Sequence, residues 1–133
     1  MEWKYVKPLT SEELINEFEC MVKYSLPNDF KACVMEHNGG RPERRAFDTD
    51  VSKERELKSF LSFNKEDKET IWKIHDWNHE ELKDKYVAFA IDNFGNLICF
   101  DVCSNRIVFM NLDDMSIEGI ADDFESFIRN LYD

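Results

Sequence analysis

Apolar positions recur with helical spacing soon after the start of the chain. Leu14 and Phe18 fall at i and i+4, with further apolar residues beside them, which predicts an amphipathic helix. The helix is expected to begin at Thr10 or Ser11, because Thr10 and Glu13 have the spacing of a capping box.

A second, shorter helix is predicted to follow at Pro27. Proline fits the first turn of a helix, where its missing N–H group costs little. The helix is expected to stop at Asn38-Gly39-Gly40, because glycine readily adopts the left-handed conformation that ends a helix.

The clearest helical period lies near the end of the chain. Apolar residues recur there at i, i+4, i+7, i+8 and i+11, and the outer face is acidic. These residues are Ile120, Phe124, Phe127, Ile128 and Leu131. A closing helix is therefore predicted over 120–131.

The middle of the chain combines a further helix with extended segments. Residues 57–63 alternate as in a strand, and residues 65–77 have a helical apolar face. Three apolar runs separated by turns then predict an antiparallel meander at 86–91, 97–102 and 106–112. About four helices with such a meander indicate an α+β fold rather than a parallel βαβ fold.

Composition fits one globular domain over residues 1–133, since 43% of the residues are hydrophobic. Neither a signal peptide nor an apolar run of roughly 18–20 residues is visible. The four cysteines form no Cys-x-x-Cys pair, and we expect buried, reduced thiols in a cytoplasmic protein. They are Cys20, Cys33, Cys99 and Cys103.

The negative charge of the chain indicates which class of partner it can bind. The net charge is −11, and residues 113–133 carry seven carboxylates against one arginine, giving −6. Such a field repels nucleic acid and anionic membranes and favours a basic protein, although solubility alone also explains an acidic surface. The candidate partner-binding residues are Asp113, Asp114, Glu118, Asp122, Asp123 and Glu125.

Catalytic and metal-binding chemistry find little support. His75 and His79 have i, i+4 spacing, but no third histidine or paired cysteine completes a metal site. Asp92 and Asp101 flank a predicted hairpin, where turn capping explains them better than acid–base catalysis. We therefore predict no catalytic residue, no metal and no cofactor.

Several segments together resemble the signatures of the SUKH (Smi/Knr-type) superfamily. Leu26-Pro27-Asn28-Asp29-Phe30 followed by Asn38-Gly39-Gly40 is similar to its first signature. Residues 87–101 are similar to its hairpin signature, and residues 120–128 to its closing element. Order and spacing agree over residues 10–132, although residues 41–86 match the family pattern in length alone.

The resemblance implies a compact α+β domain with a curved antiparallel sheet and surrounding helices. In bacteria, such domains are mostly immunity proteins that bind and block polymorphic or contact-dependent toxins, often nucleases. Fungal relatives regulate cell-wall synthesis, so a regulatory or scaffolding role is the alternative. The family has no common catalytic residues, and its binding surfaces are diverse.

Overall fold

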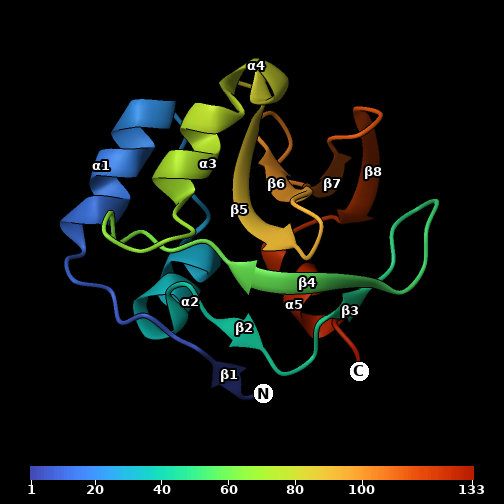
Figure 1. Ribbon diagram of the computed structural model, residues 1–133, viewed down its shortest axis with the longest axis horizontal. Helices are drawn as coiled ribbons and strands as arrows, with labels where there is room; N and C mark the ends of the chain where they lie inside the picture. The colour runs from blue at the N-terminus through green and yellow to red at the C-terminus, as the bar shows by residue number, and fades with distance from the viewer.

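The computed structural model describes residues 1–133 and has five helices and eight strands in an α+β arrangement (Figure 1). The helices are α1 (Glu13–Val22), α2 (Asn28–His37), α3 (Ile71–Trp77), α4 (His79–Leu82) and α5 (Phe124–Arg129). The strands are β1 (Trp3–Lys4), β2 (Arg41–Pro42), β3 (Ala46–Phe47), β4 (Arg55–Phe60), β5 (Tyr86–Asp92), β6 (Leu97–Asp101), β7 (Ile107–Asn111) and β8 (Ser116–Ala121).

Six antiparallel strands form one curved sheet in the order β3-β4-β5-β6-β7-β8, and β1 pairs with β2 separately. The loop between β3 and β4 runs alongside β8 (Figure 1), so that the sheet almost closes on itself. Asp50 N donates to Gly119 O at 2.9 Å, and Gly119 N donates to Asp50 Oδ1 at 3.2 Å. A Cβ atom at position 119 would lie 3.3 Å from Asp50 Oδ2, so glycine permits this close approach.

The last residues of the chain cover the outer edge of β3, at the other end of the sheet from β8. Ala46 N donates to Tyr132 O at 2.9 Å, and Tyr132 N donates back to Ala46 O at 3.0 Å. The Tyr132 hydroxyl also donates to Asp48 Oδ1 at 2.6 Å. The C-terminus is thereby fixed beside β3.

The inner side of the curved sheet holds a cluster of aromatic rings. Phe30 of α2 lies 5.1–5.3 Å from the rings of Phe89, Phe100 and Phe124, measured between centroids. Ten of the eleven phenylalanines are buried, and the exception is Phe94. On its other side, β5 contacts α3 and α4, and this explains why the strands at the centre of the sheet are apolar on both faces.

The end of the chain differs from the predicted helix over 120–131. Residues 116–121 form a fourth meander strand instead, with Ile117 opposite Met110 of β7. The helix begins only at Phe124, because the side chain of Asp123 accepts from Ser126 N and caps it. Pairing with β7 therefore overrides the helical spacing of Ile120.

The other predicted boundaries also shift. Helix α1 begins at Glu13 rather than at Thr10 or Ser11, and the expected capping box is absent. The Thr10 backbone N–H and hydroxyl instead donate to Asn64 Oδ1. Helix α3 begins at Ile71 rather than at residue 65, since the Thr70 side chain caps it by accepting from Lys73 N.

Each residue of Asn38-Gly39-Gly40 has a separate structural role. The Asn38 side chain donates to Lys7 O at 2.7 Å and to Ser62 Oγ at 3.0 Å, and it accepts from Phe63 N. Gly39 has φ +68°, which confirms the predicted left-handed residue after α2. A Cβ atom on Gly40 would lie 2.9 Å from a backbone oxygen, so only glycine fits there.

The four cysteines are all free, in agreement with the prediction. Cys99 is buried and Cys33 is half-buried, but Cys20 and Cys103 are exposed, so the expectation of four buried thiols was wrong. None of the helices has the length and apolar character needed to span a membrane.

Candidate partner-binding surface

The acidic residues singled out in the sequence lie near the two ends of β8. Asp113 and Asp114 are in the turn before this strand, while Asp122, Asp123 and Glu125 follow it. Six strand residues separate the two groups, which corresponds to about 20 Å at the usual rise per residue. They therefore belong to two different surfaces.

Glu118, in the middle of β8, differs from the residues of both groups because it is buried, with only 7% of its surface exposed. Its carboxylate accepts from Arg55 Nη2 at 3.0 Å and from Thr49 Oγ1 at 2.6 Å. Burial alone would raise the pKa of Glu118, but the hydrogen bonds from Thr49 and Arg55 outweigh it and lower that pKa. The structure thus uses Glu118 to fasten the β3–β4 loop to β8 and does not offer it as a surface carboxylate.

Two other acidic residues hold local backbone in place while staying exposed. Hydrogen bonds from Ser126 lower the pKa of Asp123, the cap of α5. Hydrogen bonds from Ser116 likewise lower the pKa of Asp114, in the β7–β8 turn. Both carboxylates stay ionised at neutral pH, so each contributes negative charge to its surface.

A groove lies between α2 and α5, with β1 at one end, and has a volume of about 560 Å³. We call it the helix groove. Asp29, Ala32, Cys33 and Glu36 line it from α2, and they lie on one helical stripe. The groove has a mixed lining: its apolar or aromatic members include Trp3, Ala32, Cys33, Phe124 and Ile128.

The apolar lining of the helix groove is held in place by stacking. Trp3 stacks on His37 with ring centroids 4.6 Å apart and meets Phe60 edge-on at 5.1 Å. Burial raises the pKa of Cys33 to about 12, and the nearby carboxylates of Glu36 and Asp29 add to this. The Cys33 thiol therefore stays protonated and acts as part of an apolar wall, not as a nucleophile or a metal ligand.

Negative charge surrounds this apolar lining. The carboxylates of Asp29 and Glu36 stand on the α2 wall and that of Glu125 on the α5 wall. The Glu125 side chain is 76% exposed and lies 3.7 Å from Arg129, an exposed i,i+4 pair of small energetic weight. Glu125 belongs to the acidic set predicted from sequence, whereas the carboxylates of α2 were missed. Their i, i+7 spacing on a predicted helix, with Cys33 between them, was the available signal.

The other acidic group adjoins an exposed apolar surface at the turns, which we call the tip surface and define by Val51, Phe94, Asp113, Asp114 and Met115. Phe94 is 88% exposed and Val51 73%. Residues 52–56 and 92–94 line one hollow there, and Leu112 N donates to Asn96 Oδ1, which joins the two hairpin turns. Sequence reasoning missed Phe94, although an aromatic residue inside an Asn- and Gly-containing turn was a visible signal.

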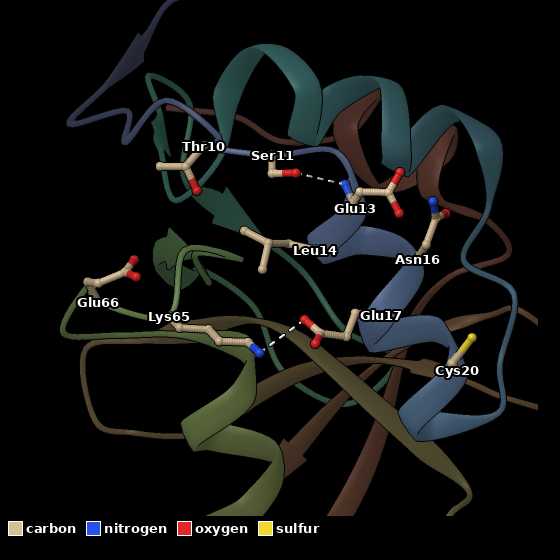
Figure 2. Close-up of a pocket in the computed structure, with 9 residues that line it drawn as sticks. All are labelled: Thr10, Ser11, Glu13, Leu14, Asn16, Glu17, Cys20, Lys65 and Glu66. Atoms are coloured by element: carbon tan, nitrogen blue, oxygen red, sulfur yellow. Dashed lines mark hydrogen bonds and ion pairs between the residues drawn. The ribbon is translucent and has the colours of Figure 1, made fainter.

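A polar hollow lies between α1 and the loop around Lys65 (Figure 2). In Figure 2, Lys65 and Glu17 point toward each other across it, with Lys65 Nζ 3.0 Å from Glu17 Oε2. Ser11 Oγ, just before α1, accepts from Glu13 N, and Cys20 lies further along α1. No histidine lines this hollow, so neither Ser11 nor Cys20 has an imidazole base there.

The residues considered for metal binding or acid–base catalysis do not converge on one point, and several bond to nearby backbone groups instead. His75 lies in α3, while His79 begins α4 with its Nδ1 2.9 Å from Asp76 O. No group of three potential ligands surrounds a common point. Asp92 Oδ1 accepts from the N–H groups of Phe94 and Asn96, as a turn-capping aspartate does. Asp101 lies at the other end of β6 and accepts from Cys103 N.

Comparison with protein families places these surfaces in context. The family model described as SMI1-KNR4 cell-wall (SUKH_6) matches residues 12–128. The chain belongs to this SUKH family. The match includes residues 41–86, for which the sequence motifs had no counterpart. None of the curated proteins compared with the chain matches it.

Membership of the SUKH family confirms the resemblance and gives its motifs a physical meaning. Phe30 of the first signature lies in the aromatic core, and Asn38 organises a buried polar network. Asp92 and Asn96 of the hairpin signature shape the turn. These signature residues support the fold, while the helix groove and the tip surface combine apolar and acidic groups in accessible positions.

Proposed function

We propose that this protein binds and neutralises a cognate polymorphic or contact-dependent toxin by protein–protein contact in the cytoplasm. The chain belongs to a SUKH family, and the resemblance to that superfamily implies an immunity or binding protein rather than an enzyme. The observation that best supports the proposal is the helix groove, whose apolar lining is bordered by exposed carboxylates. Interfaces of this kind combine an apolar anchor with charged groups that select and orient the partner.

The partner is expected to be basic, and a nuclease fits this requirement. A nuclease carries positive charge to bind phosphates, and that charge is complementary to a protein of net charge −11. Opposite fields accelerate association, which suits a protein that must capture its toxin before damage occurs.

The test is co-expression with the product of the adjacent gene. The tagged protein should capture that product in a pull-down and restore growth of cells in which the product alone is lethal. Restored growth with a stable complex would support immunity. Capture without any toxicity of the partner, or no rescue from a toxic one, would count against it.

A regulatory or scaffolding role is the second candidate, favoured by the description of the matched family as a cell-wall family. In that case, the protein would use the same surfaces on a partner that is not a toxin. Deletion of the gene would then alter cell-wall composition in cells that lack any toxin. An unchanged wall in such a deletion strain would remove this alternative.

A further inference from the structure

We propose that the helix groove receives a basic amphipathic helix of the partner, with an apolar side chain against Cys33, Phe124 and Ile128 and cations against the carboxylates. This inference rests on the proposed function, which it deepens by assigning the binding site and the chemistry of the bound segment. Three features of the groove support it.

The first feature is the arrangement of its walls. The walls are the helices α2 and α5, and β1 contributes only Trp3 at one end. The groove therefore offers side chains rather than a strand edge to a partner. A bound segment must satisfy its own backbone, and a helix does so while presenting apolar side chains at i, i+3 and i+4.

The second feature is the apolar lining. Phe124 is 4% exposed, and Cys33 and Ile128 are partly buried. An apolar side chain of the partner would therefore pack against residues whose positions are already fixed by the core. The raised pKa of Cys33 keeps its thiol neutral, so that burying it beneath a partner leaves no uncompensated charge. The volume of about 560 Å³ is enough for several side chains.

The third feature is the charge around the lining. Asp29 and Glu36 lie on one wall and Glu125 on the other, while Arg129 is the one lysine or arginine among the lining residues. Lysines or arginines flanking the apolar side chains of the bound helix would therefore meet carboxylates on both sides. An acidic amphipathic helix of the same shape would be repelled, which gives the groove a sign preference.

The tip surface is the competing location, and it fits such a helix less well. Phe94 and Val51 project from turns and are 88% and 73% exposed, so they form isolated protrusions rather than the walls of a groove. The hollow beside Phe94 has Phe94 as its one hydrophobic lining residue. A helix would find no apolar trough at this location.

The direct test uses synthetic peptides and the isotope-labelled protein. One peptide of about 14 residues, roughly four helical turns, carries leucines at helical spacing with lysines between them. A second peptide replaces every lysine with glutamate. In amide NMR spectra, the lysine peptide should shift the resonances of α2 and α5, and the glutamate peptide should not. Shifts centred on the tip surface, or equal shifts with both peptides, would overturn the assignment.

Two lysine substitutions on the same helix provide a matched pair. Ala32→Lys places a cation inside the groove, while Met35→Lys places it on an exposed part of α2 that does not line the groove. Both variants change the net charge equally. Ala32→Lys should weaken peptide binding about tenfold or more, and Met35→Lys should change it less than about twofold. Equal weakening by the two variants would show a general charge effect and would exclude the groove.

Rescue of cells from the adjacent toxin separates this inference from the proposed function. If the wild-type protein and both variants rescue growth equally, immunity stands and the groove assignment fails. If the lysine peptide binds in the groove but the wild-type protein gives no rescue, the groove assignment stands and the immunity function fails. Rescue lost only in Ala32→Lys would support both.

Discussion

The Asn38 side-chain amide donates to the Ser62 hydroxyl at 3.0 Å, and the two residues are 2% and 0% exposed. This bond joins the end of α2 to the segment after β4, and the Ser62 hydroxyl in turn donates to Asp67 Oδ2 at 2.6 Å. Asn38 also binds Lys7 O, so that three distant parts of the chain meet at one amide. The N-terminal segment that leads to Trp3 and the helix groove is fixed through this network.

Replacing Asn38 should therefore be costly. Asn38→Ala would leave the buried Phe63 N–H group without this acceptor, and would remove one donor from the part-buried Lys7 carbonyl. We expect a loss of about 2–4 kcal/mol in the free energy of unfolding, measured by urea denaturation. Asn16→Ala, at an exposed position of α1, serves as the control and should change stability by less than about 0.5 kcal/mol. Similar losses in both variants would contradict the role of the network.

The pair of Arg55 and Glu118 should contribute strongly to stability. Glu118→Gln removes the carboxylate that faces a largely buried guanidinium, which itself lies 4.1 Å from the Phe109 ring centroid. The expected loss is about 2–4 kcal/mol in urea denaturation. Glu56→Gln breaks a longer, exposed contact with Arg45 at 3.9 Å and should cost less than about 0.5 kcal/mol. A small effect of Glu118→Gln would mean that the loop does not depend on this pair.

Stability should depend on the protonation of His75. Burial lowers the pKa of His75, and Asp84 and Asp76 offset this only in part. Below the ordinary pKa of 6.5, the unfolded chain binds a proton that the folded protein resists, so stability falls as pH decreases. Wild type should lose more stability than His75→Gln between about pH 7.5 and pH 5.5. Parallel pH profiles of unfolding would refute this.

The two acidic groups at the ends of β8 should differ in their effect on toxin binding. Asp122→Lys combined with Glu125→Lys should slow association with the proposed toxin about three- to tenfold at low salt, because Glu125 lines the helix groove and Asp122 lies just before α5, which forms one of its walls. The effect should shrink as salt screens the charges. Asp113→Lys with Asp114→Lys makes the same change in net charge at the tip surface. Stopped-flow or surface-binding kinetics would measure the association rate of each variant. An equal or larger slowing in the tip variant would favour the tip surface as the binding site.

Much of the fold could be predicted because its signals are local. The helical stripe of Leu14 and Phe18 and the glycine after α2 depend on neighbouring residues alone. The strand β8 could not be predicted, because Ile117 and Ile120 have spacing that also suits a helix, and pairing with β7 decides between them. Such pairing is a tertiary effect that local patterns do not contain.

The candidate site was predicted only in part, for a similar reason. Glu125 was identified from the acidic end of the chain, but the opposite wall of the groove comes from Asp29 and Glu36, far away in the sequence. Glu118 stands among exposed acids in the sequence, yet Arg55 and Thr49 enclose it. Linear charge density identifies the sign of a surface, whereas folding decides which carboxylates remain on it.

The way the curved sheet ends has a consequence for the protein at high concentration in a cell. Strands with unpaired backbone groups tend to join other molecules and start aggregates. Here the Asp50 loop occupies the middle of the outer side of β8, and Tyr132 pairs with Ala46 on the outer side of β3. Both outer strands are therefore occupied by the chain itself. This arrangement disfavours edge-to-edge pairing of the six-stranded sheet with a second molecule.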